Sequence, residues 1–213
     1  MSNELFYRAV RAFGTAIFRL VSTPRILHAE RVPATGAYLL AANHTCAYDA
    51  PLLVAATPRM IHWLSIVEIF RHPLPRWFLT TFGALPLDRS KVDTTTVRQL
   101  ARLLKAGEVV GIFPEGGMRF DEKSVLASGG IDSGVCKLAQ LAGVPVLPCV
   151  VLGGAQFRRW RNWLPGARTP WVVAFGELIP PRTGPNRTAA RVAMAEEITQ
   201  ALRRLHAEVA GDV

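Results

Sequence analysis

The sequence predicts an α/β fold, with a largely parallel, mixed sheet flanked by helices. Short apolar runs alternate along the chain with longer helical stretches, as they do where strands are joined by helical connections. Glycine or proline stands close to the apolar runs, as expected where buried strands end. The chain has 213 residues, 50% of them hydrophobic, which suits one domain with a single sizeable core.

The expected strands are short apolar runs without helical periodicity. They lie at residues 37–42, 59–66, 109–113, 144–152 and 171–176. The fourth run contains Pro145 and Pro148. Because proline cannot donate a hydrogen bond to a neighbouring strand, we expect this strand at an edge of the sheet or beside a groove.

The expected helices lie at residues 4–21, 50–56, 73–82, 94–105, 131–142 and 187–208. The first is amphipathic and stops before Pro24. One face of it carries Phe6, Val10, Phe13, Ile17, Leu20 and Val21, and another carries Arg8, Arg11, Thr15 and Arg19. Two interpretations fit: the helix packs on the core, or it lies on an anionic membrane, where arginine and bulky apolar side chains are both favourable.

The charge balance indicates anionic partners. The formal net charge is +9 and the pI is about 10.3, which suits nucleic acid, anionic lipid or phosphate-bearing small molecules. Basic and aromatic residues interleave at 156–163, a pattern that suits base stacking, a membrane interface or a packed rim. We expect no membrane-spanning helix, because no uninterrupted apolar stretch reaches about 18 residues. We expect no secretory signal, because the arginines near the start are spread through the segment and do not form a basic cluster before an apolar run.

Three cysteines, Cys46, Cys136 and Cys149, are too few and too scattered for a disulfide framework or a zinc site, and a reducing compartment is the simplest interpretation. Cys46 stands two residues after His44, which suggests that its thiol could act as a nucleophile activated by the histidine. We favour a packing role for it, because no second activating group is evident.

His44 and Asp49 form the first candidate site. They follow the expected strand at 37–42, and open α/β sheets bind ligands at the carboxyl ends of strands. A carboxylate-held imidazole can take a proton from an alcohol, the chemistry needed for attack on a thioester. The alternatives are that Asp49 caps the following helix and that His44 makes a local hydrogen bond.

Three further blocks carry polar groups after apolar runs. In residues 113–119, Gly116 and Gly117 let the backbone approach a ligand, and Arg119 can bind phosphate; an ordinary turn with solvated charges is the alternative. Arg89, in the block at 83–90, can meet a phosphate or pair with Asp88. The fourth block is the proline-containing run at 144–148.

In this order the four blocks resemble the phospholipid/glycerol acyltransferase family, which includes 1-acylglycerol-3-phosphate acyltransferases. The family pattern is Asn-His-x-x-x-x-Asp, then Gly-…-Arg, then Phe-Pro-Glu-Gly-Thr-Arg, then Val-Pro-apolar-apolar-Pro. The match covers residues 37–151. The third block departs from the pattern: it has Gly117 and Met118 before Arg119, so the threonine is missing and the arginine stands one position later.

The resemblance implies a glycerol-3-phosphate acyltransferase-like fold, with residues 1–24 as a membrane-association helix and residues 25–213 as the acyltransferase domain. His44 would be the general base and Asp49 would orient it. Substrate would be bound by Asn43, Arg89, Glu115, Gly116, Gly117 and Arg119, and Pro145 and Pro148 would shape the acyl-binding region. No metal or prosthetic group would be needed.

The resemblance also implies partners and location. The expected function is transfer of a fatty acyl group from acyl-CoA or acyl-carrier protein to a lysophospholipid such as 1-acylglycerol-3-phosphate. The enzyme would sit peripherally on the cytoplasmic side of an anionic membrane and would not bind nucleic acid. The alternatives are the same chemistry on another, or non-phosphorylated, lipid alcohol, and a non-catalytic basic module that binds membrane or nucleic acid.

Overall fold

The computed structural model describes residues 2–87 and 94–211 and confirms the α/β fold class. A seven-stranded sheet has the strand order β1-β7-β6-β2-β5-β3-β4. The strands are β1 (Ser22–Leu27), β2 (Tyr38–Ala42), β3 (Ile61–Ile66), β4 (Leu85–Leu87), β5 (Val109–Ile112), β6 (Val146–Leu152) and β7 (Thr169–Phe175). The helices are α1 (Ser2–Val21), α2 (Asp49–Ala56), α3 (Pro73–Thr81), α4 (Thr94–Lys105), α5 (Gly134–Ala142) and α6 (Arg187–Val209).

All pairs of neighbouring strands are parallel except β6 and β7, which are antiparallel. The carboxyl ends of β2, β3, β5 and β6 therefore meet at one edge of the sheet. Because β7 runs the other way and β1 is parallel to β7, both of these strands begin at that same edge. Helix α1, which leads directly into β1, consequently ends there.

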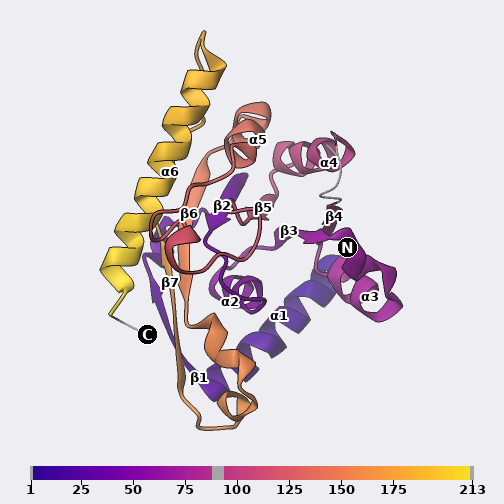
Figure 1. Cartoon of the computed structure of the whole chain (residues 1–213). Helices are drawn as coiled ribbons and strands as arrows, with labels where there is room; N and C mark the ends of the chain where they lie inside the picture. The colour runs from indigo at the N-terminus through magenta and orange to yellow at the C-terminus, as the bar shows by residue number, and fades with distance from the viewer. Residues whose placement is uncertain (1, 88–93, 212–213) are drawn as a thin grey trace.

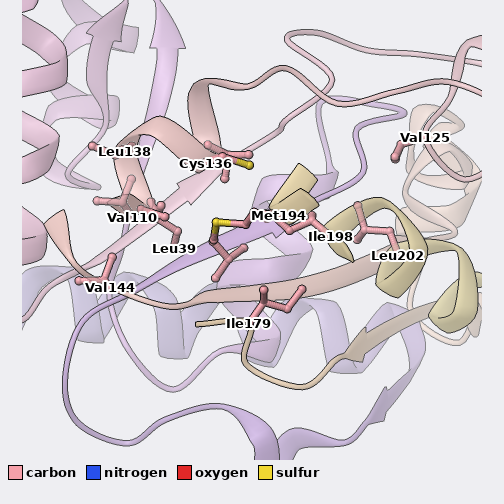
Figure 2. Packing of buried hydrophobic residues seen from close by; sticks show 14 of the residues in the cluster. Leu39, Val110, Val125, Cys136, Leu138, Val144, Ile179, Met194, Ile198 and Leu202 are labelled. Atoms are coloured by element: carbon pink, nitrogen blue, oxygen red, sulfur yellow. The ribbon is translucent and has the colours of Figure 1, made fainter. Parts of the chain in front are cut away.

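Helices cover both faces of the sheet (Figure 1). Helices α4, α5 and α6 pack on one face, and their apolar side chains form a buried cluster with alternate residues of β2, β5 and β6. Figure 2 shows part of this cluster, including Leu39, Val110, Met194 and Ile198. Helices α1 and α2 contribute to a second buried cluster on the opposite face. The two-sided burial explains why the central strands read as continuous apolar runs rather than alternating ones.

Of the two positions predicted for the proline-containing strand, an edge of the sheet or the side of a groove, the edge is wrong, since β6 lies between β7 and β2. Pro148 stands where the regular pairing of β6 with β7 ends. Its carbonyl accepts from Gly176 N just beyond the end of β7, and the next pairing, Val146 with Ile179, is shifted by one residue. The missing N–H of Pro148 therefore removes only the reciprocal bond to Gly176 at the end of the β6–β7 pairing, next to a bulge, where proline is tolerated.

Two strands were not predicted. β1 is the outer strand, four of its six residues are exposed, and Pro24 lies within it, so it lacks an apolar run. β4 has only three residues, at the opposite edge of the sheet. Both positions are edges, where proline and exposed polar side chains are tolerated.

Helix α1 packs on the domain through a face that shares Val21 with the apolar face of the helical wheel but leaves most of that face exposed. Its buried side chains include Tyr7, Phe18 and Val21. Phe13 and Leu20 are 69% and 63% exposed. Helix α3 packs beside α1, with Phe6 and Trp77 in edge-to-face contact at 5.7 Å, and it too exposes apolar side chains.

Candidate functional site

The site begins where β2 leaves the sheet at its carboxyl edge. Asn43, directly after β2, is fully buried. Its carboxamide donates to the Val151 carbonyl at 2.9 Å and accepts from the Val151 N–H at 2.8 Å. Both ends of this side chain are therefore bonded to β6, and Asn43 holds the end of β2 against its neighbour.

His44 and Asp49 are in contact at this edge. His44 Nδ1 lies 3.1 Å from Asp49 Oδ2. The Asp49 side chain is fully buried, whereas 15% of the His44 side chain is exposed. Among the described residues, no protein group bonds to His44 Nε2. One ring nitrogen is thus bonded to the carboxylate, and the other has no hydrogen-bond partner in the described part of the chain.

The Asp49 carboxylate is held by the turn that precedes it. Oδ2 also accepts from Thr45 N at 2.6 Å and from Cys46 N at 2.8 Å, and Oδ1 lies 3.1 Å from Cys46 Sγ. These N–H donors stabilise the ionised carboxylate, which is an acceptor only, so the proton of the contact with His44 belongs on Nδ1.

The alternative interpretation, that Asp49 caps the following helix, does not hold. Tyr48 is the N-cap residue of α2 and its side chain makes no capping hydrogen bond. Asp49 stands in the first turn of the helix, and its carboxylate turns back to residues 44–46 instead. The sequence of α2 is compatible with Asp49 either capping the helix or bonding to the preceding turn. In the structure the carboxylate accepts from the backbone N–H groups of the turn.

A column of aromatic rings supports His44 from one side. The imidazole stacks on Phe113, with ring centroids 3.9 Å apart and planes within 9° of parallel. Phe113 in turn stacks on Trp63 of β3, with centroids 4.9 Å apart. The column fixes the plane of the imidazole, so rotation of the ring away from Asp49 meets packed side chains.

Glu115 is buried and bonded to protein groups at both oxygens. Oε2 accepts from His44 N at 2.7 Å, and Oε1 accepts from Val125 N at 2.8 Å and from Ser124 Oγ at 3.2 Å. Only 6% of Glu115 is exposed. The structure therefore places this carboxylate behind His44, where it holds the backbone of the loop.

The glycines and the arginine of the third block lie at the surface of the site. Gly116 is exposed and has φ +70°, a conformation that favours glycine, and its N–H closes a turn onto Phe113 O at 3.1 Å. Gly117 is half-buried. Arg119 N donates to His44 O at 2.9 Å while its side chain is exposed. The block is thus tied to His44 through the backbone, and the guanidinium stays open to solvent.

Pro145 and Pro148 make no contact with His44 in the part of the chain that the structure describes. Pro148 pairs with Ala41 of β2 within the sheet, and Pro145 accepts from Leu39 N at the opposite end of the strands. Arg89 lies outside the described residues.

Two residues near Asp49 were not predicted to act there. Burial, and after it the charge of Asp49, raises the pKa of the Cys46 thiol to about 12, so the thiol stays protonated and acts as a donor to Oδ1. Gly154, at the start of the segment after β6, leaves no room for a side chain. A Cβ there would stand 2.6 Å from Asp49 Oδ1 and 2.7 Å from Cys46 Sγ.

Residues 2–87 and 94–211 contain neither a candidate metal site nor a candidate membrane-spanning helix. No group of three or more His, Cys, Asp or Glu side chains in that part of the chain is arranged to hold a metal ion. None of the helices found there combines the length and the apolar character needed to cross a bilayer.

The fold and the site define an α/β protein with a carboxylate-held histidine at the carboxyl edge of a largely parallel sheet. The family model described as Acyltransferase matches residues 24–152, more than half of the chain and the whole of the site up to β6. The chain belongs to the Acyltransferase family.

Two curated relatives are similar to this chain. The 1-acyl-sn-glycerol-3-phosphate acyltransferase of Bacillus subtilis (strain 168) is 30% identical over 130 residues, which are 61% of this chain and 62% of the relative. The enzyme of the same name from Streptococcus pneumoniae (strain ATCC BAA-255 / R6) is 24% identical over 155 residues, 71% of this chain and 56% of the relative. The matches span less than two thirds of the length of either relative.

A solved structure shares the fold. The crystal structure of the 1-acyl-sn-glycerophosphate (LPA) acyltransferase PlsC from Thermotoga maritima has a TM-score of 0.70 and 21% sequence identity, and the alignment covers 96% of this chain and 81% of that chain. At this identity the likeness supports the arrangement of sheet and helices.

Proposed function

We propose that the protein transfers a fatty acyl group from an acyl thioester to a hydroxyl group of a lysophospholipid such as 1-acylglycerol-3-phosphate. Family membership and the names of the two curated relatives support this reaction class and acceptor. The donor is acyl-CoA or acyl-carrier protein, and the reaction is expected to need no metal or prosthetic group.

The observation that carries the proposal is the contact of His44 Nδ1 with the buried Asp49 carboxylate at 3.1 Å. With the proton on Nδ1, the lone pair of Nε2 is available as a base. His44 keeps some exposure at the sheet edge, so an acceptor hydroxyl can approach Nε2. Asp49 orients the ring and stabilises the imidazolium that forms.

The proposed reaction passes through one tetrahedral intermediate. Nε2 removes the proton from the acceptor hydroxyl while the oxygen attacks the thioester carbonyl carbon. The intermediate collapses, the carbon–sulfur bond breaks, and the imidazolium returns the proton to the leaving thiolate. The products are the acylated lipid and the free thiol, and His44 is regenerated neutral.

Arg119 is the described residue that best fits the acceptor phosphate. Its guanidinium is exposed, and its backbone is joined to His44 through the 2.9 Å bond to the His44 carbonyl. A bidentate contact with phosphate would therefore form close to the base. A non-phosphorylated lipid alcohol is the second candidate acceptor, favoured by the displacement of this arginine relative to the family pattern.

The test is His44→Ala, assayed as thiol released from palmitoyl-CoA in the presence of lysophosphatidic acid. General base catalysis is worth roughly 10²–10⁴-fold, so turnover should fall by that factor while acceptor binding is retained. Wild-type turnover in the variant would refute the role of His44. Replacing lysophosphatidic acid with monoacylglycerol distinguishes the two acceptors.

We also propose that the protein binds the cytoplasmic surface of an anionic membrane peripherally. The exposed apolar side chains of α1 and α3 support this: Phe13, Leu20, Leu74 and Trp77 are each more than half exposed. Exposed arginines flank them, including Arg8 and Arg19 of α1 and Arg71 and Arg76 beside and within α3. Apolar insertion combined with basic side chains suits an anionic interface.

A further inference from the structure

Arg203 of α6 binds two backbone carbonyls of the segment that follows the third block. Its Nε donates to Val125 O at 3.1 Å, and its Nη2 donates to Gly129 O at 3.0 Å. Arg203 lies 78 residues from Val125 in the sequence, and nothing in its local pattern marks it. One guanidinium thus ties α6 to both ends of residues 125–129.

The same segment holds Glu115. Val125 donates its N–H to Glu115 Oε1, and Ser124 adds its hydroxyl to the same oxygen. The other oxygen, Oε2, accepts from the His44 N–H at 2.7 Å. The carbonyl and the N–H of Val125 therefore connect Arg203 to Glu115, and Glu115 connects the segment to His44.

The bonds made by Arg203 depend on geometry more than on charge. Arg203 lines an open groove of about 680 Å³ between α5, α6 and residues 128–131, so water screens its charge. A guanidinium can present two N–H groups in a fixed fork, whereas a lysine ammonium is a point donor. The Val125 side chain adds an apolar anchor, since it lies in the same buried cluster as Ile198 and Leu202 of α6 (Figure 2).

We propose that Arg203 is a positioning residue for the acyl transfer reaction: it aligns the N–H of Val125 with Glu115, and through Glu115 it fixes the backbone of His44. This inference rests on the proposed role of His44. Arg203 itself does not touch substrate. Its loss lets residues 125–129 shift and displaces the imidazole, while the acceptor-binding surface on the outer side of the site is unchanged.

The first experiment replaces Arg203 with methionine, which keeps an unbranched side chain without the two donors. The neighbouring Arg204, which is exposed, provides the matched control Arg204→Met. A displacement approaching 1 Å costs up to about 10²-fold in rate, so we expect kcat of Arg203→Met to fall roughly 10- to 100-fold with KM for the acceptor within about threefold. Arg204→Met should match the wild type.

The second experiment asks whether the effect passes through Glu115. In the Glu115→Gln background, adding Arg203→Met should lower kcat by less than about twofold, because residues that act as one unit are not additive. If the kcat loss of the double variant equals the product of the losses in Glu115→Gln and Arg203→Met, Arg203 has a general structural role and the proposal is overturned. A wild-type kcat in folded Arg203→Met would overturn it as well. Arg203→Lys, which keeps the charge, substitutes in the same cycle if the methionine variant does not fold.

Hydrogen exchange of the His44 amide tests the positioning role of Arg203 independently of acyl transfer activity. The amide of His44 should exchange at least about tenfold faster in Arg203→Met than in Arg204→Met, because its bond to Glu115 opens more often. Equal exchange in the two variants would contradict the positioning role whatever the activity. A wild-type chain with protected His44 but no acyl transfer would instead contradict the proposed function alone.

Discussion

Substitution of Gly154 by alanine tests how closely Asp49 must be held. The added Cβ would stand 2.6 Å from Asp49 Oδ1, so the carboxylate must move by about 0.8 Å to reach an ordinary contact of 3.4 Å. The bond from His44 Nδ1 to Asp49 Oδ2 is 3.1 Å long, so a shift of that size in the carboxylate changes its length and angle enough to weaken it. We therefore expect kcat to fall roughly 10- to 100-fold.

The same change should cost stability only modestly. Overpacking of this kind costs about 1–3 kcal/mol, which corresponds to a fall in Tm of roughly 2–12 °C for a domain of this size. The assay is thiol release at saturating acceptor, with thermal unfolding measured in parallel. Gly184→Ala is the matched control, because a Cβ at Gly184 meets nothing within 4 Å. A kcat equal to that of the control would refute the argument that this glycine is needed to seat Asp49.

Two other changes probe Cys46 and the exposed face of α1. Cys46→Ser should keep turnover within about threefold, because the hydroxyl still donates to Asp49 Oδ1, whereas Cys46→Val should lower it roughly tenfold. Because burial raises the pKa of the Cys46 thiol to about 12, little thiolate is present below pH 10. N-ethylmaleimide at pH 7.5 should therefore not inactivate the enzyme by alkylating Cys46. Rapid alkylation of Cys46 would contradict the burial of its thiol. The double variant Phe13→Asp/Leu20→Asp should sediment with phosphatidylglycerol vesicles at least fivefold less than the wild type. Val192→Asp, which changes a similarly exposed residue of α6, should sediment like the wild type. Equal sedimentation of the double variant and the Val192→Asp control would refute membrane binding through α1.

Periodicity and motif order predicted the parts of the fold that are buried. The central strands are continuous apolar runs, and each was placed within about two residues of its observed ends. β1 was missed because an edge strand needs no apolar run, and the position of β6 was misjudged because Pro148 falls at a bulge that only the pairing with residues 176–179 reveals.

The candidate site was predictable as far as its motif extends. The spacing of His44 and Asp49 left a helix cap and a local hydrogen bond open as alternatives, and the resemblance of the four ordered blocks to the acyltransferase family predicted the pair. The structure brings the two side chains into contact. The supporting groups were not predictable, because Trp63, Gly154 and Arg203 come from three distant segments and reach the site only through tertiary packing. Their residue types are ordinary, and no local pattern distinguishes them.

The reversal of direction between β6 and β7 has a consequence for how the proposed enzyme meets its substrate. It makes α1 end at the edge where His44 stands, and an aromatic cluster joins the two, with Phe18 of α1 and Tyr48 both in contact with Trp163. On the proposed membrane surface, a lipid held near the end of α1 would reach the base without leaving the bilayer. Turnover would then be interfacial: its rate would follow the mole fraction of lysolipid in the membrane rather than its bulk concentration, and successive acceptors would arrive by lateral diffusion.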